Sequence, residues 1–410
     1  MKILMVIPYV PSQIRIRPYQ FLRGLAKLGH QITLATVWSN EQEYLELQEL
    51  RPYCSRILAR RQPRWRSLWN CLLALPGRNP LQSVYSWNGA LATEISGLAQ
   101  NGDFDVAHVE HLRGAKYGIA LKTLLQQRGM PQPVVWDSVD AISLLFRLAA
   151  QENTQLNTRL ITSLEIDRTE WFEGKMVDFF DHVLVTSPID RQALLELQTE
   201  KPDKPPLSVI PNGVDLEYFK PDPHIPREDN LIVVSGKMSY HANVAMALYL
   251  VNEIMPLVWE RKPDARVAIV GKDPPAVVRS LAEDRRVTVT GTVPDLRVYL
   301  QRATIAAAPI RYGVGVQNKV LEAMACGAPV VATRGITAGI HAQAGEEILV
   351  ADNPLAFAEE VIKLLEHPEK RHALSLAGRR FVEKNHNWDE ICTKLTEIYA
   401  EAGIRVRNHR

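Results

Sequence analysis

The sequence predicts an α/β protein of two domains, each built around a parallel sheet with helices on both faces. Three observations support this fold class. The chain has 410 residues, the length of two or three ordinary domains. Short, wholly apolar segments alternate with segments of helical periodicity, as expected for parallel strands buried on both faces. This alternation stops at a proline-rich stretch near mid-chain and then begins again.

The first half of the chain begins with an apolar run at 2–7, which predicts a strand. Residues 17–28 then carry apolar side chains at helical spacing and end at Gly29, a residue suited to closing a helix. A long helix is expected at 154–180. The remaining strands of this half are expected at 32–37, 105–109, 134–136, 182–186 and 207–210. These elements predict a first domain at 1–215.

The second half repeats this organisation. Its strands are expected at 231–235, 265–270, 286–290, 304–308, 330–333 and 348–350. Prolines place a linker at 216–229. A second domain is expected at 230–385, followed by a terminal segment at 386–410. Both domains are expected to be doubly wound and Rossmann-like, with a cleft between them, because such sheets bind ligands at the carboxyl ends of their strands.

Composition disfavours several classes of function. The 48 Lys and Arg against 46 Asp and Glu leave a net charge of +2, too near balance for a nucleic-acid-coating protein. The four cysteines lie far apart without a C-x-x-C, which disfavours zinc ribbons and disulfide frameworks and favours a reducing cytosol. Pro8–Arg17, after the first strand, contains no glycine, so a nicotinamide dehydrogenase is disfavoured. We identify no Asp-x-Asp placed to chelate a metal with a diphosphate, and expect no metal and no cofactor.

The most informative segment runs Pro309-Ile-Arg-Tyr-Gly-Val-Gly-Val-Gln-Asn-Lys-Val-Leu-Glu-Ala-Met-Ala-Cys-Gly-Ala-Pro-Val-Val. It predicts a strand end, a glycine loop and a helix from about 316 to 326, whose free N–H groups suit a diphosphate. Lys319 would add a charge in the first turn, and Glu322 could accept hydrogen bonds from ribose hydroxyls. The alternative is a plain turn followed by a solvated helix.

This string resembles the signature of the retaining GT-B glycosyltransferases of family four, in which the corresponding helix and strand bind a nucleotide-sugar donor. Further similar segments lie at 28–34, 105–111, 209–219, 287–295 and 386–410, the last of which crosses back onto the first domain in the family. The loop 235–243 and the Gly-x-Gly-x-x-x-Lys-x-x-Glu spacing are similar to exopolysaccharide and exosortase-associated sugar transferases.

The resemblance implies a donor site in the second domain. Its expected binding residues are Gly236, Lys237, Asn243, Gly271, Val293, Gly313, Gly315, Val316, Gln317 and Asn318, with Lys319 and Glu322 as catalytic candidates. The first of two family glutamates is absent, because Val314 occupies its position. Lys237 can stand for the first of two diphosphate-binding basic residues, but the position of the second falls near Ala242 and Asn243, neither of which is basic. We therefore expect Lys319 to supply the missing charge.

The acceptor side is expected in the first domain. Asp105-Val-Ala-His-Val-Glu-His resembles a family segment whose last His contacts the donor sugar. Here Glu110 takes that position and His111 follows, so both are catalytic candidates that could align a hydroxyl, whereas His108 is expected to be a satisfied core histidine. Arg15 and Arg17, in the loop after the first strand, are expected to meet the acceptor, with simple surface charge as the alternative.

A basic segment stands out at 51–78. It contains seven arginines and no acidic residue, and its apolar residues include Trp65 and Trp69. This pattern favours an amphipathic element on an anionic membrane surface, and a helix pair with a solvated basic face explains it equally well. No uncharged apolar stretch reaches the length needed to span a bilayer, the nearest being Ser67–Gly77.

Together these features predict a retaining glycosyltransferase that moves a sugar from a UDP- or GDP-type nucleotide sugar to a glycan or lipid-linked acceptor, in cell-envelope or exopolysaccharide synthesis. It is expected to be cytoplasmic, with a peripheral position on the inner leaflet of the plasma membrane as a further expectation. Nucleic acid is not an expected partner. Two alternatives stay open: a GT-B sugar-nucleotide epimerase, and a non-catalytic protein that binds sugar nucleotides or glycans.

Overall fold

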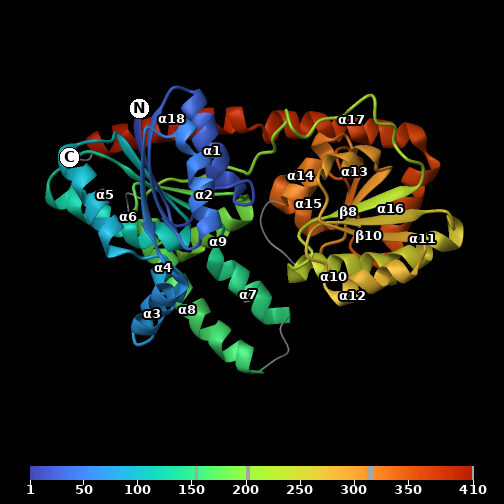
Figure 1. Ribbon diagram of the computed structural model, residues 1–410, viewed down its shortest axis with the longest axis horizontal. Coiled ribbons are helices and arrows are strands. Elements are labelled where there is room, and N and C mark those ends of the chain that lie inside the picture. The colour runs from blue at the N-terminus through green and yellow to red at the C-terminus, as the bar shows by residue number, and fades with distance from the viewer. Residues whose placement is uncertain (153–155, 200–203, 312–316, 409–410) are drawn as a thin grey trace. The chain divides into compact units, whose positions relative to one another are not determined.

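The computed structural model describes residues 1–152, 156–199, 204–311 and 317–408. The chain divides into two compact units, and each is built on one parallel sheet (Figure 1). Unit 1 comprises Met1–Pro211 and Trp388–Arg410, and unit 2 comprises Asn212–Asn387.

Unit 1 contains a seven-stranded sheet. Its strands are β1 (Lys2–Ile7), β2 (Gln31–Trp38), β3 (Arg56–Arg61), β4 (Val106–Glu110), β5 (Val134–Val139), β6 (His182–Val185) and β7 (Leu207–Val209), in the spatial order β3-β2-β1-β4-β5-β6-β7. Its helices are α1 (Ile16–Lys27), α2 (Glu41–Glu49), α3 (Arg64–Ala74), α4 (Leu81–Tyr85), α5 (Gly89–Asn101), α6 (His111–Gln127), α7 (Ile142–Glu152), α8 (Leu156–Phe179), α9 (Pro188–Leu197) and α18 (Trp388–Asn408).

Alternate residues of β1 enter two separate hydrophobic cores. Leu4 and Val6 pack into the core that α5, α6 and α8 cover. The odd-numbered side chains of β1 pack into the core that α1 and α18 cover. Because successive side chains of a strand point to opposite faces, both faces of this sheet are buried, as the wholly apolar run predicts.

Unit 2 contains a six-stranded sheet around one continuous core. Its strands are β8 (Leu231–Ser235), β9 (Arg266–Val270), β10 (Val287–Gly291), β11 (Ile305–Ala308), β12 (Val330–Ala332) and β13 (Leu349–Val350), in the order β10-β9-β8-β11-β12-β13. Its helices are α10 (His241–Tyr249), α11 (Met255–Arg261), α12 (Ala276–Arg279), α13 (Arg297–Arg302), α14 (Asn318–Ala325), α15 (Arg334–Ile340), α16 (Pro354–Glu366) and α17 (Pro368–Asn385), with a π-helical turn at Leu250–Ile254.

The predicted fold class is confirmed, since both sheets are parallel and doubly wound. One strand was not predicted: β3 lies inside the basic segment 51–78 and pairs in parallel with β2. This corrects the expectation that the whole segment is an amphipathic element or a helix pair. β3 is an edge strand, where exposed arginines are tolerated and discourage pairing with another chain.

In the part of the chain that the structure describes, one helical stretch, His241–Arg261, is long and apolar enough to cross a membrane by length and composition alone. This corrects the sequence analysis, which named Ser67–Gly77 as the stretch nearest to a membrane-spanning length. Half of its most apolar window is buried, and Met246, Leu250 and Ile254 lie in the core of unit 2. This stretch therefore packs as a core helix of its unit.

Candidate functional site

Each sheet has one point at which the strand order reverses. In unit 1 it lies between β1 and β4, and in unit 2 between β8 and β11. Loops at the carboxyl ends of the strands beside such a point form the usual ligand crevice of a doubly wound sheet. Most of the described candidate residues follow the strands beside these two points, and Val293 follows the outermost strand β10.

The loops after β8 and β9 touch each other in unit 2. A Cβ atom added to Gly271 would lie 1.8 Å from the carbonyl oxygen of Gly236, and one added to Gly236 would lie 2.7 Å from Nδ2 of Asn243. The Gly236 N–H also donates to the Val270 carbonyl at 3.0 Å. Both glycines are therefore required by close packing, which holds these loops at the edge where a ligand would approach.

Asn243 connects the loop after β8 to the helix after β11. Its Nδ2 donates to the Lys237 carbonyl at 2.9 Å, and its Oδ1 accepts from Lys319 Nζ at 2.5 Å. Asn243 lies in the first turn of α10 and Lys319 in the first turn of α14. The Lys319 ammonium thus lies beside the position at which the second diphosphate-binding charge was expected.

Glu322 lies one turn beyond Lys319 on α14, and both side chains are half-buried. Burial raises the pKa of the Glu322 carboxyl to about 7, although the nearby Lys319 charge lowers it. Burial lowers the pKa of Lys319 to about 8, against the opposing effect of Glu322. Within the described residues, no side-chain hydrogen bond to the Glu322 carboxylate is found.

These two pKa values predict a bell-shaped pH dependence for nucleotide-sugar binding. Below about pH 7 the Glu322 carboxyl is protonated and stops accepting from the ribose, so affinity should fall by up to about tenfold per pH unit. Above about pH 8 Lys319 loses its charge, and affinity should fall again. Calorimetric titration across this range measures both limbs. Glu322→Gln should remove the acid limb, and an unchanged acid limb in that variant would contradict the assignment.

The remaining donor-side candidates are placed as follows. Gln317 is the N-cap residue of α14. Asn318 Oδ1 accepts from Asn212 Nδ2 at 3.5 Å, and Asn212 was not among the predicted site residues. Lys237 has an exposed side chain, and Val293 is half-buried against the unit 2 core after β10. Gly313, Gly315 and Val316 lie outside the described residues.

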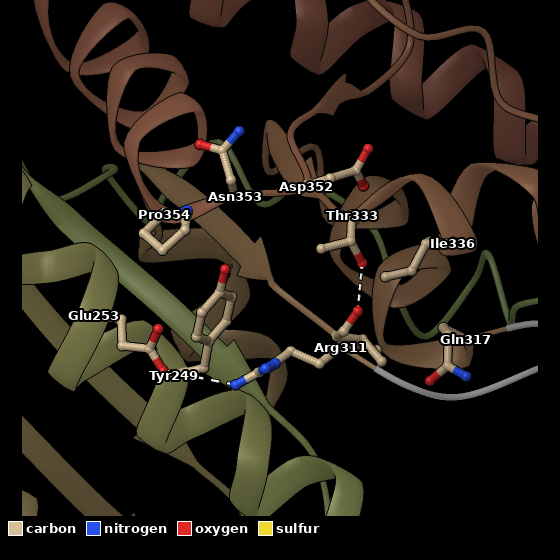
Figure 2. Close-up of a pocket in the computed structure, with 11 residues that line it drawn as sticks. Tyr249, Glu253, Arg311, Gln317, Thr333, Ile336, Asp352, Asn353 and Pro354 are labelled. Carbon is tan, nitrogen blue, oxygen red and sulfur yellow. Dashed lines mark hydrogen bonds and ion pairs between the residues drawn. The ribbon is translucent and has the colours of Figure 1, made fainter. Parts of the chain in front are cut away.

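A cavity of about 450 Å³ opens at the carboxyl ends of β11, β12 and β13 (Figure 2). Among the sequence-predicted residues that the structure describes, Gln317 lines it. The Arg311 guanidinium lies 3.7 Å from the Glu253 carboxylate and 5.2 Å from the centre of the Tyr249 ring. Thr333 Oγ1 donates to the Ile310 carbonyl at 2.7 Å, which ties the ends of β11 and β12 together.

In unit 1, the candidate acceptor side joins the loop after β1 to the end of β4. The Tyr9 hydroxyl donates to Glu110 Oε1 at 2.6 Å, a partnership that the sequence did not indicate. Burial, followed by the charge of Asp137, raises the pKa of Glu110 to about 8, so this carboxyl is protonated at neutral pH. Glu110 Oε2 is buried and has no partner within the described part of the chain.

His111 begins α6 with a left-handed backbone, φ 62°. Such a conformation is costly for a residue other than glycine and is often found at functional sites. Burial lowers the pKa of His111 to about 4, so the ring is neutral at pH 7. Its Nδ1 accepts from the Arg113 N–H at 3.3 Å, which leaves the proton on Nε2 and makes that atom a hydrogen-bond donor.

The two arginine candidates differ sharply. Arg15 is partly exposed, pairs with Glu43 at 3.1 Å and lies over the Tyr9 ring. Arg17 was expected in the acceptor loop, and this expectation is wrong. It lies in the first turn of α1, is 4% exposed, and pairs with the fully buried Asp137 at 2.8 Å. Because its guanidinium is enclosed, Arg17 holds the unit together and is not presented to an acceptor.

His108 is a core residue, as the sequence suggested, but it is not fully satisfied, because its buried Nε2 has no hydrogen-bond partner within the described residues. Its ring is fully buried, and Nδ1 forms a 2.9 Å hydrogen bond with the Tyr399 hydroxyl of α18. Burial lowers the pKa of His108 to about 4, so the ring stays neutral.

Asp103 and Asp105 form an Asp-x-Asp that precedes β4. They lie at the amino ends of the strands, whereas the candidate residues follow the carboxyl ends. There Asp105 Oδ2 accepts from the Lys2 N–H at 2.7 Å. Within the described residues no cluster of three His, Cys, Asp or Glu side chains is placed to hold a metal. Metal-independent chemistry stays a prediction.

The chain is similar to several known proteins. It is 21% identical over 332 residues to D-inositol 3-phosphate glycosyltransferase 1 of Catenulispora acidiphila, covering 74% of each chain. It is 27% identical over 246 residues to a GDP-mannose-dependent monoacylated alpha-(1-6)-phosphatidylinositol monomannoside mannosyltransferase of Corynebacterium glutamicum, covering 52% of this chain and 61% of the relative. The crystal structure of the Anabaena protein HepE in complex with UDP superposes with a TM-score of 0.66 at 14% identity, covering 98% of this chain and 100% of that one.

The two doubly wound parallel-sheet units, together with this structural likeness, define a protein of the GT-B fold. More particularly, the chain belongs to the group 1 glycosyltransferases. The family model described as "Glycosyltransferase Family 4" matches residues 17–218, and that described as "Glycosyl transferases group 1" matches residues 229–367.

Proposed function

We propose that this glycosyltransferase takes its sugar from a nucleoside-diphosphate sugar that binds at the switch point of unit 2. The observation that carries the proposal is the hydrogen bond from Lys319 to Asn243, with the Lys237 carbonyl bonded to the same Asn243 and Glu322 one turn beyond Lys319. Lys237 and Lys319 would hold the diphosphate, and Glu322 the ribose hydroxyls. Main-chain groups near Val293 would meet the base. UDP and GDP are the candidate nucleotides, because the HepE structure contains UDP and the mannosyltransferase relative is named for GDP-mannose.

We propose that transfer proceeds with retention, on one face of the sugar, and that the chain's residues need no metal or other cofactor for it. The acceptor hydroxyl oxygen forms a bond to the anomeric carbon while the bond from that carbon to the phosphate oxygen breaks. The acceptor proton passes to the leaving phosphate, so charge and atoms balance. Lys319 would stabilise the charge that develops on the phosphate. The neutral His111 would donate from Nε2 to a sugar hydroxyl.

The acceptor we propose is a glycan or a lipid-linked sugar used in cell-envelope or exopolysaccharide synthesis. Two observations support this choice: the relatives are named for inositol phosphate and phosphatidylinositol acceptors, and unit 1 carries an exposed apolar helix face. A lipid-linked acceptor would place the protein in the cytoplasm at the inner surface of the plasma membrane.

A thermal-shift panel with UDP, GDP, ADP, CMP and NAD tests the donor assignment. A ligand at about 100 times its Kd stabilises a folded protein by about 2.7 kcal/mol, which raises the melting temperature by several degrees. We expect a shift with one nucleoside diphosphate and none with NAD. Glu322→Ala should abolish that shift while leaving the melting temperature of the free protein nearly unchanged. The absence of a shift with every diphosphate would refute the proposed site.

A further inference from the structure

Helix α3 of unit 1 has its apolar side chains on the outside. Its inner stripe consists of Ser67, Asn70, Cys71 and Ala74, which are small or polar and repeat at helical spacing. Its outer stripe consists of Trp65, Leu68, Trp69, Leu72 and Leu73, whose exposed fractions are 69%, 64%, 56%, 53% and 65%. A surface helix of a globular protein normally shows the opposite pattern. The outer face is therefore suited to burial against something other than unit 1.

Hydrogen bonds rather than apolar contacts attach this helix to the unit. Asn70 Nδ2 donates to the carbonyls of Val84 and Trp87, at 3.1 and 2.9 Å. At the carboxyl end of α3, Arg168 donates to the Leu75 carbonyl at 2.6 Å. In Figure 1, α3 lies beside α4 and away from the strands of its sheet. These bonds fix which face of α3 points outward, so its exposure is built into the fold.

The charges around α3 indicate what covers this face. Arg64 and Arg66 lie on the helix and are exposed, as are Arg61 before it and Arg78 after it. Between Glu49 and Glu94 the chain contains no acidic residue. Tryptophans and leucines flanked by arginines match the interface of an anionic bilayer, where rings and apolar chains enter the headgroup boundary and cations meet lipid phosphates. A helix of 11 residues is too short to span the bilayer, so it would lie in the surface.

We propose that the outer face of α3 docks unit 1 onto an anionic lipid surface. The position of the helix gives this docking a use. α3 follows the carboxyl end of β3, and His111 follows the carboxyl end of β4, so both lie on the same side of this parallel sheet. It packs on α4, where Tyr85 lies 5.3 Å beneath the guanidinium of Arg113, two residues after His111. Docking would hold that edge at the membrane surface, where a lipid-linked acceptor is presented. This last step rests on the proposed function, whereas the docking itself does not.

Vesicle sedimentation of the full chain, without donor or acceptor, tests the docking separately from transfer. We expect binding to vesicles that contain phosphatidylglycerol, weak binding to phosphatidylcholine alone, and release by salt. Trp65→Ser with Trp69→Ser should weaken binding by at least about tenfold, because two interfacial rings are lost. Arg64→Glu with Arg66→Glu should weaken it by about tenfold or more.

Matched control variants lie on exposed positions of unit 2. Leu355→Ser with Leu376→Ser removes apolar side chains that are 62% and 47% exposed, and Arg285→Glu with Arg380→Glu reverses the same number of charges. Both should bind like the wild type. Melting temperature and the nucleotide shift verify that every variant is folded. Equal binding by the α3 variants and the controls would overturn the proposal. The proposal would also be overturned if the wild type did not bind anionic vesicles. In that case, a change from dimer to monomer in the α3 variants would show that the outer face of α3 contacts a second copy of the chain.

Discussion

Replacing Lys319 with alanine is expected to lower turnover by about 10² to 10³, the cost of losing one preorganised charge beside a developing oxyanion. The physical reason is geometric. Nζ of Lys319 is held 2.5 Å from Oδ1 of Asn243, so the ammonium is already in place before the leaving phosphate gains charge. Lys237 meets Asn243 through its main-chain carbonyl, and its own side chain is exposed. Initial rates with the nucleotide sugar that the thermal-shift panel identifies measure this effect.

Two further variants separate charge from position. Lys319→Arg keeps the charge and should retain more activity than Lys319→Ala. Asn243→Ala keeps Lys319 but removes the side-chain amide that bonds both to Lys319 and to the Lys237 carbonyl. This variant should therefore lower turnover by a smaller factor than Lys319→Ala, and it should weaken nucleotide binding. Near-normal turnover in Lys319→Ala would show that another group neutralises the diphosphate and would remove Lys319 from the mechanism.

Replacing Arg17 with alanine is expected to destabilise unit 1 by about 3 to 5 kcal/mol, the usual cost of leaving one partner of a buried ion pair without its counter-charge. Asp137, its partner, is fully buried. Nη1 of Arg17 also donates to the Ile210 carbonyl at 2.9 Å. This bond ties α1 to the last residues of the segment Met1–Pro211, where the chain leaves unit 1. The free energy of unfolding of unit 1, from urea denaturation followed by circular dichroism, measures this change.

Arg15→Ala is the matched control, because Arg15 is 38% exposed and its pair with Glu43 is partly solvated. Such pairs contribute about 1 kcal/mol or less. The double variant Arg17→Met with Asp137→Leu should recover most of the stability, because neither charge then remains buried alone. If Arg17→Ala instead kept wild-type stability and raised only the KM for acceptor, the guanidinium would be an acceptor ligand and the buried placement would be wrong.

The sequence alone predicted the fold class and most strands. Buried parallel strands are short continuous apolar runs, and this signal is local, so β1 and β8 were expected at the residues where they occur. β3 was missed because an edge strand with arginines at its ends lacks that signal. The sequence also predicted the donor motif, because its glycines, Lys319 and Glu322 are close together along the chain.

What only the tertiary structure decided are the relations between residues far apart in the chain. Lys319 and Asn243 are 76 positions apart, and they meet because β8 and β11 are neighbours at the switch point of the sheet. Arg17 and Asp137 are 120 positions apart, and their pairing buries a charge that was expected in the acceptor loop. The outward face of α3 likewise depends on which side chains unit 1 holds. Periodicity is a property of neighbouring residues, whereas burial and charge pairing depend on which distant segments pack together.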